Sequence, residues 1–136
     1  MIKVRKLVSA FLSIKNDAAD SMFDNFEYDG TTFDKDWKAQ CVKDKIRYTI
    51  ASHYLSTISS LDVDASITYA DAMVPLFDMQ LTGIKRLMFP KDFNLEYNTH
   101  STYRYLISMI ANTYNDLYKT INDLAKQNNS KEENGA

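Results

Sequence analysis

The sequence contains few of the residues that build tight loops and cross-links. Its 136 residues include three glycines, two prolines and one cysteine. The glycines are isolated, so the chain has neither the glycine-rich loop of P-loop nucleotidases nor the dinucleotide-binding fingerprint, each of which needs several glycines close together. A single cysteine excludes an internal disulfide, which suits a reducing compartment such as the cytoplasm.

Long apolar runs are also absent. No stretch reaches the roughly 18 apolar residues that a membrane-spanning helix requires. The start, "MIKVRKLVSAFLSIKND", has the basic front and apolar middle of a signal peptide, but Lys15 and Asp17 follow at once and no small-residue cleavage site appears. We therefore expect a helix over residues 3–15 and a protein located in the cytoplasm or a virion, not a secreted one.

Charge and composition fit one globular domain. A hydrophobic fraction of 45%, a charged fraction of 25% and a net charge of −2 are ordinary values. We expect a helical domain over residues 1–126 and a disordered polar tail over 127–136. The N-terminal cations have no acid among them, which indicates either a solvated helix face or an electrostatic contact with a partner. These cations are Lys3, Arg5 and Lys6.

Apolar periodicity predicts an all-α fold, a bundle of four to five helices. Asp17 can cap a short second helix after residues 3–15. A third helix over about 33–59 carries a continuous apolar ridge and should lie at the centre of the core. The ridge consists of Val42, Ile46, Ile50, Tyr54 and Ile58. No strand pattern is present.

Two further segments show a heptad pattern, with apolar residues alternately three and four positions apart. The first seam is Ile67, Ala70, Val74, Phe77, Leu81, Ile84 and Met88. Pro75 lies inside it, so either the helix is kinked near residues 71–75 or its main part starts there. The second seam belongs to a helix over about 100–126. It is Tyr103, Ile107, Ile110, Tyr114, Leu117, Ile121 and Leu124.

Tyr105 and Met109 fall on the face of this last helix opposite to its seam. An exposed aromatic beside an exposed methionine indicates a contact surface. We therefore predict that these two residues, together with Lys3, Arg5 and Lys6, bind a protein partner.

Candidates for catalysis and metal binding are weak. Cys41, His53 and His100 are the only thiol and imidazole groups, and each is better explained by packing or solvation. Asp62, Asp64 and Ser66 open like a calcium loop, but the positions of its essential glycine and glutamate are Ile67 and Met73. Helix capping explains the aspartates more simply. We expect no enzyme activity, cofactor or metal.

Nucleic-acid binding remains as an alternative function. Phosphate contacts require clustered lysine and arginine side chains. Six such residues are candidates, namely Lys43, Lys45, Arg47, Lys85, Arg86 and Arg104. The overall acidic balance and the absence of a helix-turn-helix signature count against this alternative.

The layout of residues 31–88 resembles the helical adaptor proteins of bacteriophage head-to-tail connectors. The stretch "DKIRYTIASHYLSTISSLDVDASITYADAMVPLFDMQLTGIKRL" has their long apolar helix, short acidic break and second helix rich in alanine, tyrosine and leucine. Pro75 and the heptad seams depart from that pattern. The resemblance implies a ring-forming homo-oligomer that contacts a portal. We expect a non-catalytic interaction or assembly protein, and a small inhibitor of a host enzyme fits the same features.

Overall fold

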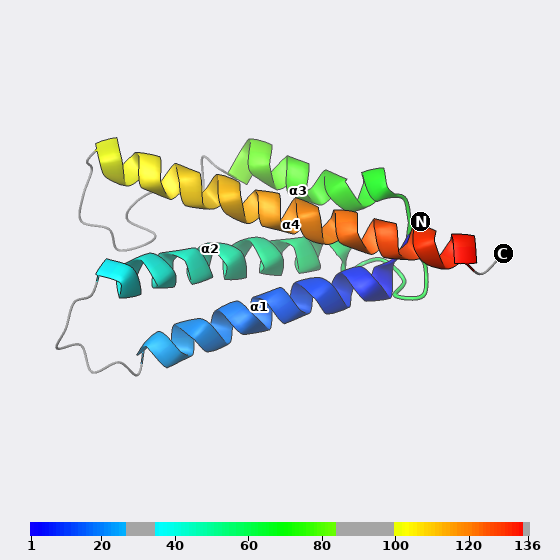
Figure 1. Cartoon of the computed structure of the whole chain (residues 1–136), viewed down its shortest axis with the longest axis horizontal. Helices are drawn as coiled ribbons and strands as arrows, with labels where there is room; N and C mark the ends of the chain where they lie inside the picture. Colours follow the sequence, from blue (N-terminus) through cyan, green and yellow to red (C-terminus); the bar gives the residue numbers. More distant parts are fainter. Residues whose placement is uncertain (27–34, 84–99, 135–136) are drawn as a thin grey trace.

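The computed structural model describes the backbone of residues 1–26, 35–83 and 100–134, and the side chains of 1–22, 42–82 and 107–127 (Figure 1). Within these segments the chain forms four helices and two short strands. Their order is β1 (Ile2–Lys3), α1 (Val4–Phe26), α2 (Lys35–Ile58), β2 (Ser66–Ile67), α3 (Tyr69–Gly83) and α4 (His100–Asn134). The predicted all-α class is confirmed.

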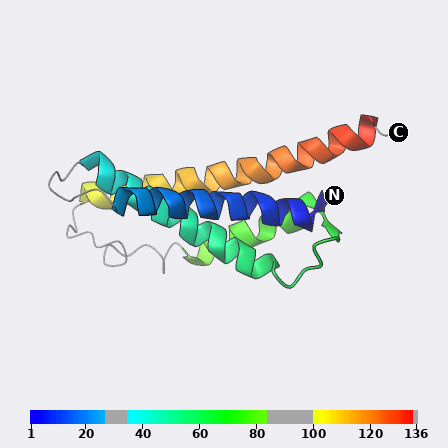
Figure 2. The same cartoon turned by 90° about the horizontal axis from the view of Figure 1, so that it is seen from below.

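The helices run roughly along the long axis of the molecule (Figures 1 and 2). α1 lies beside α2, and α3 lies beside α4 with the opposite chain direction. One hydrophobic core joins all four helices and β1. Its buried members are Ile2, Leu7, Phe11, Ile46, Ile50, Ala51, Tyr54, Ile58, Ala72, Met73, Leu76, Met79, Ile110, Tyr114, Leu117 and Ile121.

The prediction for α2 is confirmed in its main features. Ile46, Ile50, Tyr54 and Ile58 are all buried, as the ridge predicts. The Tyr54 ring stacks on Phe11 of α1, with ring centroids 3.9 Å apart and planes 15° apart. Its hydroxyl donates a hydrogen bond of 2.8 Å to the carbonyl oxygen of Ala72 in α3. Tyr54 therefore links three helices, and burial raises the pKa of its hydroxyl.

The predicted break near Asp17 is wrong. α1 is one helix from Val4 to Phe26, and Asp17 is exposed on its surface while Ala18 beside it is buried. An aspartate on the solvent face of a helix costs only a few tenths of a kcal/mol in helix propensity, roughly, so it does not end the helix.

The N-terminus is held by backbone pairing that the sequence did not predict. β1 and β2 are antiparallel, with Ile2 opposite Ile67 and Lys3 opposite Ser66. The pairing continues as Val4 N–H donates to the Ala65 carbonyl at 3.0 Å. Strands of two residues are too short to show an alternating pattern, which is why the expectation of no strands was wrong.

α3 buries a different face from the predicted seam. Its buried residues are Ala72, Met73, Leu76 and Met79, whereas Val74, Phe77 and Leu81 of the seam are 47%, 48% and 78% exposed. The helix starts at Tyr69, where the Thr68 hydroxyl accepts a hydrogen bond of 3.1 Å from the Asp71 N–H. Pro75 thus lies inside the helix and does not begin it.

α4 follows its predicted seam only in the middle. Ile110, Tyr114, Leu117 and Ile121 are buried, but Ile107 is 58% exposed. The hydroxyl of Tyr114 is buried and has no hydrogen-bond partner among the described residues. The helix continues to Asn134, so residues 127–134 have helical backbone where the sequence predicts a disordered tail.

Candidate functional site

An exposed apolar row on α3 is the first candidate for a functional surface. We call Val74, Phe77 and Leu81 the α3 stripe. Their spacings of three and four place them on one face of the helix. Isolated exposed apolar residues are common, but three on one face form a continuous row of the kind that packs against another helix.

The two edges of the α3 stripe differ. Along one edge, Asp71 and Asp78 are exposed and lie seven residues apart, two turns along the same side of the helix. The other edge lies against α4, where the Phe77 ring is 5.2 Å from the Tyr118 ring, centroid to centroid. Tyr118 also donates a hydrogen bond to Oε1 of Gln80. The α3 stripe is therefore bordered by α4 on one side and by the carboxylates of Asp71 and Asp78 on the other.

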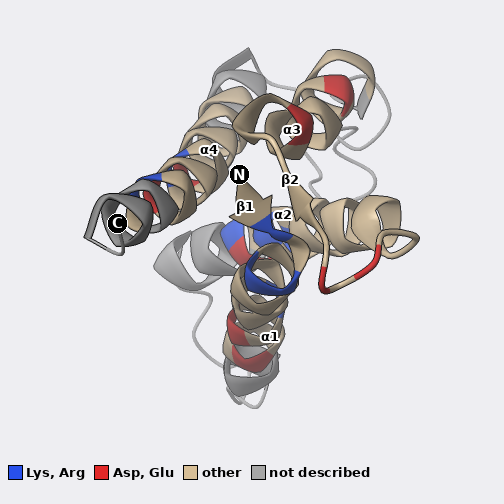
Figure 3. Ribbon diagram, turned by 90° about the vertical axis from the view of Figure 1, so that its right-hand side faces the viewer, with Lys and Arg blue, Asp and Glu red and all other residues tan. Residues whose placement is uncertain are grey.

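No basic residue balances these carboxylates on α3. The helix has two aspartates and neither lysine nor arginine among its 15 residues. Figure 3 shows the acidic positions on the ribbon of α3 and no basic ones. On α3 itself, the apolar side chains of the stripe are thus accompanied by negative charge alone.

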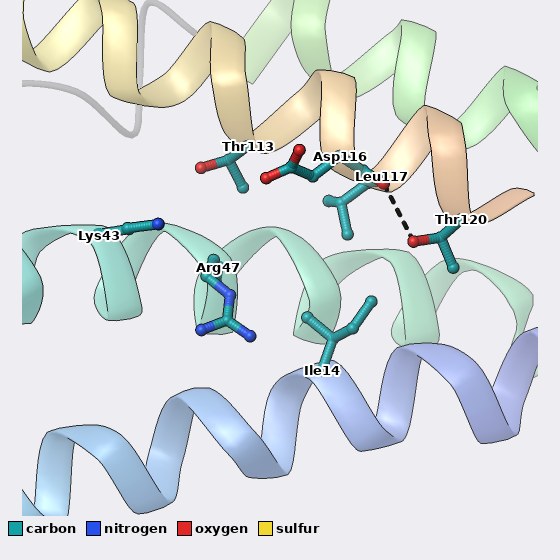
Figure 4. A pocket seen from close by; sticks show the side chains of 7 residues that line it. All are labelled: Ile14, Lys43, Arg47, Thr113, Asp116, Leu117 and Thr120. Atoms are coloured by element: carbon teal, nitrogen blue, oxygen red, sulfur yellow. Dashed lines mark hydrogen bonds between the residues drawn. The ribbon is translucent and has the colours of Figure 1, made fainter.

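A cleft lined by residues of α1, α2 and α4 is the second candidate (Figure 4). Its volume is about 240 Å³. The lining residues are Ile14, Lys43, Arg47, Thr113, Asp116, Leu117 and Thr120. A neighbouring cavity of about 270 Å³ shares three of them and adds Ser108, Met109 and Asn112. The shared residues are Lys43, Thr113 and Asp116.

The charges in the cleft balance. The side chain of Arg47 is 29% exposed and contacts Asp44, with Nη1 of Arg47 3.4 Å from Oδ1 of Asp44. Asp44 is fully buried and also accepts a hydrogen bond from the Ser21 hydroxyl. Lys43 and Asp116 lie on opposite walls, so the lining has two cations and one anion, and the buried carboxylate of Asp44, outside the lining, pairs with Arg47. This balance is unlike a phosphate-binding groove, which concentrates positive charge.

The structure gathers only part of the predicted nucleic-acid set. Lys43 and Arg47 are four residues apart and share the cleft. Lys45 is exposed and lies two residues from each of them, so it points from another side of α2. Lys85 and Arg86 lie outside the described residues, as does the side chain of Arg104.

Met109 is one of the predicted partner-binding residues whose side chain the structure describes. Met109 is half-buried, packs against the core and lines the second cavity, so its predicted exposure on an outer face is wrong. The reason is that α4 packs against α2 on one side and α3 on the other, so its buried arc is wider than one seam. The side chain of Tyr105 lies outside the described residues.

The N-terminal cations have different surroundings. Lys3 belongs to β1 and is exposed, while Lys6 is half-buried. Arg5 donates a hydrogen bond of 2.7 Å to Oδ1 of Asp64, and this contact raises the pKa of the guanidinium. Arg5 therefore connects α1 to the loop before β2, in addition to any contact it makes with a partner.

The acidic loop does not cap a helix. Asp62 accepts a hydrogen bond of 3.0 Å from the Asp64 N–H, an Asx turn, and Asp64 pairs with Arg5. Thr68 supplies the cap of α3, so the predicted capping role of these aspartates is wrong. Among the described residues, no three histidine, cysteine, aspartate or glutamate side chains are grouped to hold a metal ion.

Of the candidate nucleophile and bases, the structure describes only the side chain of His53. His53 is exposed on α2, and the side chains of Cys41 and His100 lie outside the described residues. Within the described segments, no helix has the combined length and apolar character of a membrane span.

Comparisons with protein-family models, curated proteins and solved structures found no match to this chain.

Proposed function

We propose that this chain is a non-catalytic protein-interaction module that binds a helical partner through the α3 stripe. The exposure of Val74, Phe77 and Leu81 on a helix that already buries its other apolar face is the observation that supports it. Covering apolar surface stabilises a complex by roughly 25 cal/mol per Å² before the costs of association are counted.

Pairing with an amphipathic helix fits this geometry. A partner helix with apolar side chains at three- and four-residue spacing can pack them against a row of the same spacing. The contact between the Phe77 and Tyr118 rings borders the α3 stripe on the α4 side and would align the partner along α3. The adaptor of a phage head-to-tail connector is the specific form of this function that the sequence resemblance implies, with neighbouring subunits or a portal as the partner.

Selection from a display library of amphipathic helical peptides tests the proposal. Peptides selected on the wild-type protein should lose binding to the triple variant Val74→Ser, Phe77→Ser, Leu81→Ser. The matched control is Leu12→Ser on α1, because Leu12 is 43% exposed and outside the stripe. Peptides that bind the triple variant and the wild type equally would show that α3 is not the binding surface.

Nucleic-acid binding is the second candidate because Lys43 and Arg47 share one cleft. Its test is the binding of single- and double-stranded DNA over a series of salt concentrations. A phosphate-driven complex must weaken steeply as salt rises. The carboxylate of Asp116 in the same cleft, and that of Asp44 paired with Arg47, favour the protein-binding function instead.

A further inference from the structure

The acidic edge of the α3 stripe determines which kind of helix can cover it. Asp71 and Asp78 would lie at the rim of any helix packed along Val74, Phe77 and Leu81. In paired helices, the residues flanking the apolar seam meet across the interface, and their charges select the partner. A partner with cations there gains attraction, whereas a partner with anions meets repulsion.

A second copy of α3 lacks the required complement. It would bring two further carboxylates and no lysine or arginine from its own 15 residues. In an antiparallel pair the two acidic edges would face each other directly. Charge therefore disfavours pairing of α3 with itself and favours a different helix.

We infer that the partner of the α3 stripe is a basic amphipathic helix, with apolar residues at heptad spacing and lysine or arginine seven residues apart along one flank. This inference rests on the proposed function and adds the charge of the partner to it. The apolar row provides contact area, and the two aspartates provide selection among helices of equal apolar character.

Three synthetic peptides of three heptads test the charge of the partner. All have leucine at the apolar positions, and the flanking positions are lysine, glutamine or glutamate. Titration calorimetry should find that the lysine peptide binds about tenfold or more tightly than the glutamate peptide, with the glutamine peptide between them. The advantage of the lysine peptide should shrink as salt is added.

Charge reversal on the protein should first remove and then invert this order. Asp78→Lys leaves one aspartate and one lysine on the edge, so it should bind the lysine and glutamate peptides about equally, and the double variant with Asp71→Lys should bind the glutamate peptide more tightly. Asp78 is nearly three turns from the Thr68 cap, so the variant leaves the start of the helix intact, whereas the double variant with Asp71→Lys alters the first turn as well. The matched control is Asp123→Lys, an equal charge change at an exposed site of α4, which should keep the wild-type order.

The outcomes separate the inference from the proposed function. Equal binding of the three peptides, lost in Phe77→Ser, would overturn the basic partner but keep the proposed function. No binding of any peptide would overturn both. An equal shift in Asp123→Lys would show a general effect of net charge and overturn the inference. Concentration-dependent dimerisation in light scattering that Asp78→Lys strengthens would identify a second copy as the occupant and also overturn it.

Discussion

The Tyr54 hydroxyl of α2 donates a 2.8 Å hydrogen bond to the carbonyl oxygen of Ala72 in α3, 18 residues further along the chain. Both residues are fully buried. The bond fixes which face of α3 meets α2, because Ala72 can be reached only when its side of the helix is turned inward. It therefore also determines that Val74 and Phe77 stay outside.

Two tyrosine-to-phenylalanine substitutions should have opposite effects on stability. Tyr54→Phe removes a buried hydrogen bond and should lower the free energy of unfolding by about 1 kcal/mol. Tyr114→Phe removes a buried hydroxyl that has no partner within the described segments, and should leave the free energy of unfolding unchanged or raise it by up to about 1 kcal/mol. Urea denaturation measures both. A loss of equal size in Tyr114→Phe would indicate that its hydroxyl has a partner in solution.

Stability should fall in alkaline solution partly because of Tyr114. Burial, with a contribution from Tyr118, raises the pKa of Tyr114 from 10.0 to about 12. The folded state therefore holds this proton more tightly than the unfolded state does, so the stabilisation is complete below pH 10 and is lost as pH rises towards about 12. Denaturation across this range should show a shallower decline for Tyr114→Phe than for the wild type. Parallel declines would contradict the raised pKa.

The buried carboxylate of Asp44 should be important for stability. Asp44→Ala leaves the Ser21 hydroxyl and the Arg47 guanidinium without this acceptor, and should lower the free energy of unfolding by about 3 kcal/mol. Asp116→Ala, at an exposed position across the same cleft, should change it by no more than about 0.5 kcal/mol. Chemical denaturation of both variants makes the comparison. If both variants change the free energy of unfolding by a similarly small amount, the carboxylate of Asp44 is in contact with water and not buried.

Sequence periodicity predicted the class of the fold and the facing of α2. The ridge from Ile46 to Ile58 is long, and its members there are all buried. α3 was predicted with the wrong face because it has two apolar rows. Ala72, Leu76 and Met79 have the same three- and four-residue spacing as Val74, Phe77 and Leu81. Tertiary contacts distinguish them, namely the packing of the buried row in the core and the Tyr54–Ala72 hydrogen bond.

The candidate site was less predictable than the fold. The residues of the α3 stripe were identified as a helix seam, but their exposure depends on how α3 packs against α2 and α4. Met109 was misplaced for a related reason, since the sequence does not show that α4 has neighbours on two sides. The spacing of Asp71 and Asp78 was visible in the sequence, but it has meaning only once the row between them is known to face outward.

Parallel measurements of stability and peptide binding on the triple variant Val74→Ser, Phe77→Ser, Leu81→Ser test the central claim most directly. Because these side chains are about half or more exposed, serine should change the free energy of unfolding by only about 1 kcal/mol, while binding of the lysine-flanked peptide should be lost. A cooperative loss of folding by several kcal/mol would contradict the account, because it would place the α3 stripe in the core and leave no free surface for a partner.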